Sequence, residues 1–228
     1  MSIEIFQKEL EKLGILLSEK QFSQLERFYQ LLIEWNQKMN LTRITDKEEV
    51  YLKHFYDSLT LYKVIDLKKE ITLCDVGSGA GFPGIVLKIA FPNLKITLID
   101  SLLKRVNYLN EIIKELGLQD IQAYHTRAED YAKINRENFD IVTARAVANL
   151  ADLSELCIPM VKKDGYFVAM KANAEDEIEN SKEIIPLLGG KIVKVEQFKL
   201  PIEESTRTLI QVQKISITSS KYPRRKQK

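Results

Sequence analysis

An apolar segment that runs directly into a glycine cluster constrains the fold of this chain more than any other feature of its sequence. The segment Ile71–Val76 is followed by the residues Gly-Ser-Gly-Ala-Gly-Phe-Pro-Gly at positions 77–84. A short β-rich run with such a turn after it is typical of a buried parallel strand that leads into a crossover helix. We predict that this helix begins near Phe82 or Pro83, and that a ligand binds where the strand ends.

Further β-rich runs follow this segment and alternate with stretches of helical length, which indicates an α/β fold with a parallel sheet. Seven strands are predicted, at Ile71–Val76, Lys95–Asp100, Ile121–His125, Phe139–Ala144, Gly165–Lys171, Lys191–Phe198 and Arg207–Lys214. The connection at residues 199–206 is too short for a crossover helix, so the last two strands are expected to form an antiparallel pair at one edge. The expected architecture is a seven-stranded Rossmann-like sheet.

The residues before the sheet are predicted to be helical. Apolar side chains recur at three- and four-residue steps within residues 3–17, and the capping-box pattern Ser18-x-x-Gln21 predicts the start of a second helix. Another capping box, Thr45-x-x-Glu48, predicts a helix that reaches about His54, and one more short helix is expected over Asp57–Val64. We expect three parts, namely an N-terminal helical cap at 1–66, a catalytic domain at 67–216 and a basic C-terminal tail at 217–228.

Composition limits the class of protein. The 228 residues are 45% hydrophobic and 29% charged, which suits one globular α/β domain with a small extension. No apolar run approaches the ~20 residues of a membrane-spanning helix, and the N-terminus has no signal-peptide core, so a cytoplasmic protein with no membrane partner is expected. Only two cysteines and two histidines occur, with no paired metal-ligand pattern, so we expect no metal and two buried thiols at Cys74 and Cys157.

The charge of the chain is unevenly distributed. A net charge of +2 does not by itself indicate a nucleic-acid-binding protein. The last eight residues, 221–228, carry five positive charges and no negative charge. Such a segment can attract phosphate groups through counterion release, and it can equally be a solvated tail.

The glycine cluster fits two cofactors. Residues 79–84 satisfy the dinucleotide pattern G-x-G-x-x-G, and residues 75–81 satisfy the methyltransferase pattern D-x-G-x-G-x-G. Gly77 and Gly79 would let a ligand approach the backbone, where amides at the helix start favour an anionic group. Asp75 favours S-adenosylmethionine, because dinucleotide folds usually have an apolar residue there. We expect its carboxylate to interact with the amino-acid end of that cofactor, directly or through water.

Polar residues also follow the next three predicted strands, at the edge where ligands bind in open parallel sheets. Asp100 ends the second strand and is placed to accept hydrogen bonds from ribose hydroxyls. The polar stretch at residues 125–130 follows the third strand and suits an adenine edge or an ordinary helix cap. Arg145 ends the fourth strand, where a charge needs a partner, and is a candidate for binding an anionic or nucleobase substrate.

Several motifs together resemble the glucose-inhibited division protein B family, bacterial methyltransferases that modify guanine N7 in small-subunit ribosomal RNA. The resemblance covers nearly the whole chain and rests on Asn40-Leu-Thr42, His54-x-x-Asp57-Ser58, the loop from Asp75 to Gly84, Asp100-Ser-Leu-Leu-Lys-Arg105, Arg127-Ala-Glu129, Ala144-Arg-Ala146 and Arg207-Thr-Leu-Ile210. One departure is Met170-Lys171-Ala172, where the family usually has glycine after the lysine.

The resemblance implies a class I methyltransferase sheet and the cofactor S-adenosyl-L-methionine. It implies cofactor contacts from Gly77, Phe82, Ala128, Glu129 and Arg145, to which the strand-end argument adds Gly79 and Asp100. The implied partner is 16S ribosomal RNA, free or within the small subunit, and we expect the enzyme to be a monomer. Candidates for contact with the RNA are His54, Arg145, Lys171 and Arg207.

Guanine N7 explains the lack of an obvious catalytic base, because its in-plane lone pair carries no proton. Positioning should therefore do most of the work, with Arg145 and Lys171 as candidates for holding the base or its phosphates. Two other functions stay open on the sequence. A small NAD-dependent reductase would need a hydride-transfer pair such as Tyr-x-x-x-Lys, which is not found in a suitable place, and an RNA-binding module would bind RNA without transferring a methyl group.

Overall fold

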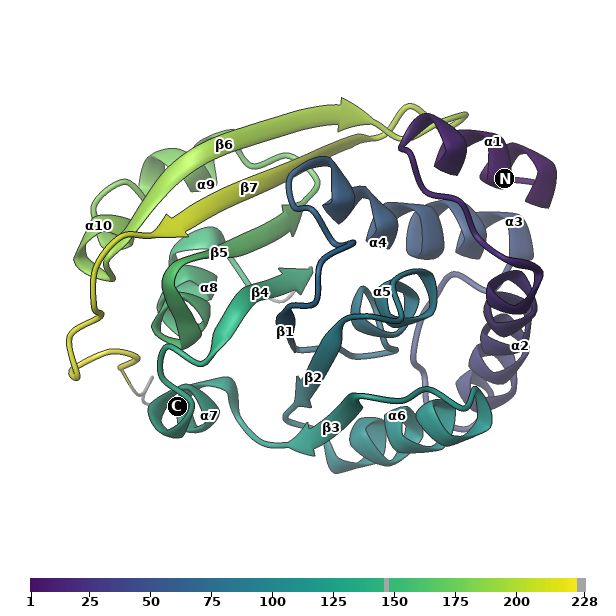
Figure 1. The fold of residues 1–228 in the computed structure, drawn as a ribbon, viewed down its shortest axis with the longest axis horizontal. Helices are drawn as coiled ribbons and strands as arrows, with labels where there is room; N and C mark the ends of the chain where they lie inside the picture. Colours follow the sequence, from purple (N-terminus) through teal and green to yellow (C-terminus); the bar gives the residue numbers. More distant parts are fainter. Residues whose placement is uncertain (146–147, 225–228) are drawn as a thin grey trace.

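A single seven-stranded sheet forms the centre of the computed structural model, which describes residues 1–145 and 148–224 (Figure 1). The strand order is β3-β2-β1-β4-β5-β7-β6. All neighbours up to β5 pair in parallel, whereas β7 pairs antiparallel with both β5 and β6. The strands are β1 Thr72–Val76, β2 Lys95–Asp100, β3 Ile121–His125, β4 Phe139–Arg145, β5 Val161–Lys171, β6 Gly190–Lys199 and β7 Thr206–Lys214.

Helices cover both faces of the sheet. In Figure 1 the N-terminal helices, drawn in purple and blue, lie on the same side as α5 and α6, and α7 and α8 lie on the other side. The helices are α1 Ile3–Lys12, α2 Glu19–Asn36, α3 Lys47–Val50, η1 Tyr51–Tyr56, α4 Asp57–Leu59, η2 Thr60–Lys63, α5 Gly84–Ala90, α6 Leu103–Glu115, α7 Ala128–Ile134, α8 Leu150–Cys157, η3 Ile158–Met160, α9 Glu175–Asn180 and α10 Ile184–Leu187. None of the helices in the described part of the chain is long and apolar enough to cross a bilayer.

Alternation of side chains along the strands produces two hydrophobic cores. On β1, Leu73 faces the core that contains the N-terminal helices, and Cys74 faces the core under α7 and α8. Phe28 and Phe55 pack in the first core together with residues of the sheet, so the helical segment and the sheet bury one continuous apolar surface. Both cysteines, Cys74 and Cys157, are buried free thiols, as predicted.

The predicted strands agree closely with the structure. The bounds of β2 and β3 match the prediction residue for residue, and the antiparallel edge pair of β6 and β7 is confirmed. β5 begins at Val161 and not at Gly165, because Val161 already pairs with Phe139 before a register shift in the ladder. The helix after the glycine cluster begins at Gly84, with Pro83 as its cap, slightly later than predicted.

The N-terminal helices agree with the prediction in part. Ser18 caps α2 through the predicted capping box, but α1 ends at Lys12 and does not reach residue 17, because Gly14 has a φ of 77°. The predicted cap at Thr45 is wrong by one residue, since the Asp46 side chain accepts the Glu49 N–H. A carboxylate at Asp46 is the stronger N-cap.

Residues 47–63 form one uninterrupted helical run where two helices were predicted. The run consists of α3, the π-helical turn η1, α4 and the 3₁₀ turn η2. The Asp57 N–H donates to Leu52 O, which is the i→i−5 bond that widens a helix. Periodicity does not reveal such a turn, because it changes the spacing of side chains by only one residue.

Gly84 allows the close packing of α5 against the sheet. Its N–H donates to Asp75 Oδ2 at 3.0 Å. A Cβ at this position would lie 2.2 Å from Leu98 Cδ2 and 2.8 Å from Asp75 Oδ2. The last glycine of the cluster therefore has a packing role.

We expect Gly84→Ala to lower the free energy of unfolding by about 1–3 kcal/mol, because the added methyl group must displace Leu98 or Asp75. Urea titration of both proteins measures the change. Gly117→Ala is the control, since nothing lies within 4 Å of its added Cβ and only its positive φ opposes alanine, at about 1 kcal/mol. An unchanged unfolding midpoint for Gly84→Ala would contradict the packing role.

Candidate functional site

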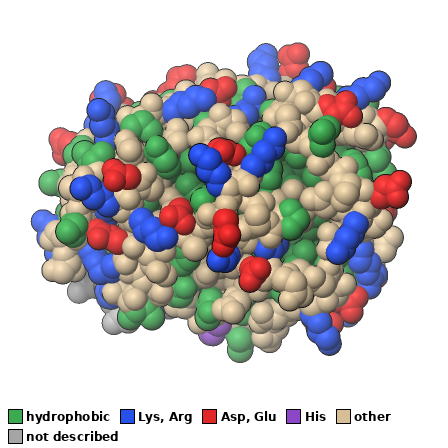
Figure 2. Space-filling model, in the orientation of Figure 1, with side chains coloured by type: hydrophobic (Ala, Val, Ile, Leu, Met, Phe, Trp, Pro, Cys, Tyr) green, Lys and Arg blue, Asp and Glu red, His purple; other side chains and the backbone are tan. Residues whose placement is uncertain are grey.

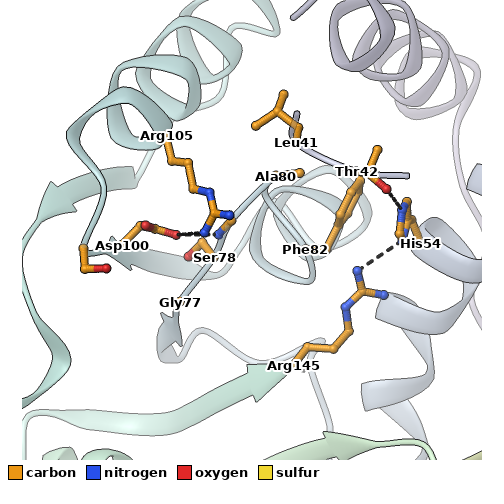
Figure 3. A pocket seen from close by; sticks show the side chains of 12 residues that line it. Leu41, Thr42, His54, Gly77, Ser78, Ala80, Phe82, Asp100, Arg105 and Arg145 are labelled. Carbon is orange, nitrogen blue, oxygen red and sulfur yellow. Dashed lines mark hydrogen bonds and ion pairs between the residues drawn. The ribbon is translucent and has the colours of Figure 1, made fainter. Parts of the chain in front are cut away.

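Three adjoining cavities lie where the parallel strands end. The central cavity, about 350 Å³, lies between the glycine cluster, the ends of β2 and β4, and the N-terminal segment (Figure 3). The Ala128 cavity, about 180 Å³, shares Gly77, Asp100 and Ser101 with the central cavity and is also lined by Val76, Ile99, Thr126, Arg127, Ala128, Glu129 and Leu156. The Arg207 cavity, about 300 Å³, shares His54 and Arg145 with the central cavity and is also lined by Ile44, Lys53, Asp57, Met170, Lys171, Ala172, Arg207 and Leu209.

The Asp100 carboxylate joins β2 to the glycine cluster. Its Oδ2 accepts the Gly79 N–H at 3.0 Å, and its Oδ1 accepts the Leu102 N–H at 2.9 Å. Arg105 Nη1 lies 3.5 Å from Oδ2, and Figure 3 marks this contact with a dashed line. A carboxylate has about four acceptor positions, so these three contacts fix Asp100 and leave capacity for one further donor from the cavity.

Asp75 lies at the base of the same loop but lines none of the three cavities. Its side chain is fully buried, and Oδ1 has no hydrogen-bond partner among the described residues. Burial raises the pKa of Asp75 to about 6, and the hydrogen bond from the Gly84 N–H works against this rise. An unsatisfied buried carboxylate oxygen is costly, and a cationic or hydrogen-bonding ligand group nearby would offset that cost.

The Ala128 cavity contains the polar stretch after β3. Arg127, Ala128 and Glu129 form the start of α7, and Arg127 pairs with Glu129 at 3.2 Å. The start of this helix lies beside the end of β2. Seven residues predicted to contact the cofactor line the central cavity, the Ala128 cavity or both, namely Gly77, Gly79, Phe82, Asp100, Ala128, Glu129 and Arg145, whereas Asp75 lines neither.

Arg145 connects the end of β4 to the helical run at residues 47–63. Its Nη1 donates to Lys53 O and to Asp57 Oδ2, both at 3.0 Å, and its Nη2 donates to His54 Nδ1 at 3.2 Å. The guanidinium also lies over the Phe82 ring, 5.2 Å from its centroid. The helical run therefore presents Lys53 O and the side chains of His54 and Asp57 to one guanidinium group. This forked arrangement suits arginine and not lysine.

His54 is held in a neutral state within this cluster. Burial and the neighbouring Arg145 charge lower its pKa to about 3 from the ordinary 6.5. His54 Nδ1 lies 3.2 Å from Arg145 Nη2 and 3.1 Å from Lys53 O, and Nε2 lies 3.0 Å from Thr42 Oγ1. The ring stacks on Phe82 with centroids 4.4 Å apart. His54, a residue predicted to contact RNA, therefore lines both the central cavity and the Arg207 cavity.

Arg207 and Lys171 complete the Arg207 cavity. Arg207 Nε donates to Asp57 Oδ1 at 3.2 Å, so one carboxylate holds two guanidinium groups. Lys171 forms an ion pair with Glu177 at 2.7 Å and donates to Ala148 O. All four predicted RNA-contact residues line this cavity. Sequence reasoning gave Asp57 no role, although it belongs to the motif His54-x-x-Asp57-Ser58.

The basic tail lies apart from the three cavities in its described part. Arg224 pairs with Glu155 on α8 at 2.7 Å, and Arg136 donates to the backbone oxygens of Thr218, Ser219 and Tyr222. Residues 225–228, and Ala146 of the β4 motif, lie outside the described residues.

Figure 2 shows basic and acidic side chains interspersed over the face that it draws. No cluster of metal-ligating side chains occurs among the described residues.

We expect His54 to make the protein sensitive to acid. Because its pKa is lower in the folded state, the unfolded state binds more protons from about pH 6.5 down to about pH 3, and stability falls over this range by up to about 1.4 kcal/mol per pH unit. His54→Gln removes this term and should flatten that loss in urea titrations at several pH values. The raised pKa of Asp75 makes stability rise as the pH falls, but it does so in both the unchanged protein and His54→Gln, so it cancels when their pH profiles are subtracted. Parallel pH profiles would contradict a neutral His54.

Comparisons with known proteins agree with this geometry. A family model described as rRNA small subunit methyltransferase G matches residues 21–208. Proteins named Ribosomal RNA small subunit methyltransferase G are similar over nearly the full chain. The Bacillus licheniformis protein is 55% identical, with 99% of this chain and 95% of that protein covered. The Oceanobacillus iheyensis protein is 54% identical, with coverage of 99% and 96%.

Solved structures share the fold at low sequence identity. A SAM dependent methyltransferase from Aquifex aeolicus is 20% identical, with a TM-score of 0.56 over 80% of this chain and 98% of that chain. A SAM-dependent O-methyltransferase from Thermotoga maritima is 16% identical, with a TM-score of 0.53 over 82% and 72%. These likenesses show the Rossmann-like methyltransferase fold. The family match and the identities above 50% go further, and the chain belongs to the rRNA small subunit methyltransferase G family.

Proposed function

We propose that this protein transfers a methyl group from S-adenosyl-L-methionine to N7 of a guanine in 16S ribosomal RNA. The single observation that carries the proposal is the adjoining set of cavities, in which a cofactor-sized site and a cationic, partly apolar cavity meet at His54 and Arg145. Family membership supports the same reaction. We further propose that the enzyme is a cytoplasmic monomer that acts on the RNA alone or within the small subunit.

The residues of the central and Ala128 cavities fit this cofactor. Asp100 retains acceptor capacity for a ribose hydroxyl, and Ala128 and Glu129 would border the adenine. The unpartnered Oδ1 of Asp75, at the base of the glycine cluster, is suited to the cationic amino group, directly or through water. When bound, S-adenosylmethionine supplies an electrophilic methyl group on a positively charged sulfur.

The Arg207 cavity fits a flat, electron-rich base. Ile44, Met170 and Leu209 supply apolar contacts, and the two guanidinium groups offer donors for guanine acceptors or phosphate. Arg145 has donor capacity left on Nε and Nη2, beyond its contacts with described residues. No group needs to remove a proton from N7, and this agrees with the neutral, hydrogen-bonded state of His54. Orientation of the base toward the methyl group is the main task of this chain, and it supplies several kcal/mol in favourable cases.

Incubation with labelled S-adenosylmethionine tests the function. Small ribosomal subunits and free ribosomal RNA serve as the two substrates, and chemical cleavage at N7-methylguanine maps the product. We expect one labelled guanine in at least one substrate. Tight RNA binding with no label would support a noncatalytic RNA-binding protein, and oxidation of NADH would support a reductase.

We expect Arg145→Ala to slow single-turnover methyl transfer by about 100-fold with both substrates saturating. Arg145 lines both the central cavity and the Arg207 cavity, so its loss should disturb the orientation of the base relative to the cofactor. Arg145→Lys should recover little, since an ammonium cannot make the three forked contacts. The control is Arg224→Ala, which removes an exposed ion pair on α8 and should leave the rate unchanged. Circular dichroism checks the fold, and equal rates for Arg145→Ala and the unchanged enzyme would exclude the role.

A further inference from the structure

We propose that Asp57 supplies the negative charge that offsets the positive charge acquired by guanine during methyl transfer, while it also holds Arg145 and Arg207 in place. The proposal rests on the proposed function and assigns a role to a residue that neither the sequence argument nor the cofactor site uses. It starts from the position of Asp57 in the Arg207 cavity, next to the point where this cavity meets the central cavity.

The geometry of Asp57 is that of a shared counter-ion. Oδ2 accepts from Arg145 Nη1 at 3.0 Å, and Oδ1 accepts from Arg207 Nε at 3.2 Å. The Asp57 side chain is 8% exposed, and those of Arg145 and Arg207 are 15% and 19% exposed. A carboxylate in this partly desolvated position acts on neighbouring charges with little screening by water.

The other charged groups around the cavity are paired elsewhere. Lys53 forms ion pairs with Glu49 at 2.8 Å and Glu203 at 3.0 Å, and Lys171 pairs with Glu177 at 2.7 Å. His54 is neutral, because its pKa is lowered to about 3. Asp57 is therefore the only acidic side chain among the described residues that line the Arg207 cavity, and two guanidinium groups depend on it.

The reaction moves a positive charge into this cavity. The N7 lone pair forms a bond to the methyl carbon as the carbon–sulfur bond breaks, and the electrons of that bond remain on sulfur. The sulfur becomes neutral, the base becomes cationic, and no proton is transferred in this step. Two guanidinium groups without Asp57 would attract the neutral guanine through O6 and then repel the methylated base. A fixed carboxylate behind them lowers this repulsion as the charge develops.

Binding of two nucleotides tests the electrostatic role without any turnover. Guanosine 5′-monophosphate and 7-methylguanosine 5′-monophosphate are titrated into the enzyme by calorimetry, in mildly acidic buffer where the methylated base keeps its positive charge. The quantity of interest is the ratio of the affinity for the methylated nucleotide to the affinity for the unmethylated one. We expect this ratio to be about tenfold lower in Asp57→Asn than in the unchanged enzyme. Asp57→Glu, which keeps the charge, should recover part of this ratio.

Kinetics of the same variants separate charge from simple structural support. Asp57→Asn should slow single-turnover transfer to ribosomal RNA by about tenfold or more, while its affinity for the RNA stays equal or increases, since the cavity gains net positive charge. A purely structural role would weaken RNA binding and transfer together. Asp140→Asn is the matched control, because Asp140 is a partly buried carboxylate that pairs with Lys162 at 3.0 Å near the start of β4, outside the three cavities.

The outcomes are distinct. An unchanged nucleotide ratio in Asp57→Asn, no nucleotide binding to the unchanged enzyme, or a parallel loss of RNA affinity and rate would overturn the electrostatic role of Asp57. If the unchanged enzyme nevertheless labels ribosomal RNA at guanine N7, the proposed function stands. If it labels no RNA, the proposed function has failed, whatever the nucleotide titrations show.

Discussion

The contact between Arg145 and Asp57 joins the two halves of the site. Arg145 lies at the end of a buried strand, where a charge without a partner would be strongly unfavourable. Asp57, Lys53 O and His54 supply the partners from the helical run at residues 47–63. The N-terminal helices are therefore fixed to the sheet by polar contacts at the site as well as by the hydrophobic core that they share with it.

The π-helical turn η1 makes this contact possible. In this turn the Asp57 N–H donates to Leu52 O and His54 O, and Lys53 O accepts from Arg145 Nη1. The same turn places His54 against Phe82 of the glycine cluster. Phe82, His54 and Arg145 contact one another, and they connect the glycine cluster, the helical run at residues 47–63 and the end of β4. The central cavity and the Arg207 cavity are therefore shaped together.

The charges of the site follow from its burial. Burial lowers the pKa of His54 and raises that of Asp75, so both groups are biased toward their neutral forms. Arg145 and Arg207 both form ion pairs with Asp57. A neutral His54 together with paired permanent charges suits a methyl transfer that needs no proton transfer.

The sequence by itself determined the sheet, the glycine cluster after β1 and the polar residues at strand ends. Strand periodicity and turn residues are local, so β2 and β3 could be predicted to the residue, and Asp100 and Arg145 fell where strands end. Only the tertiary structure decided which of these residues meet. Asp57 and Arg207 are 150 positions apart, and the π turn that brings His54 to Arg145 leaves no trace in the periodicity. Such contacts form because a buried charge is unfavourable without a partner, and the partner can lie far away in the sequence. No local sequence pattern indicates which residues will pair.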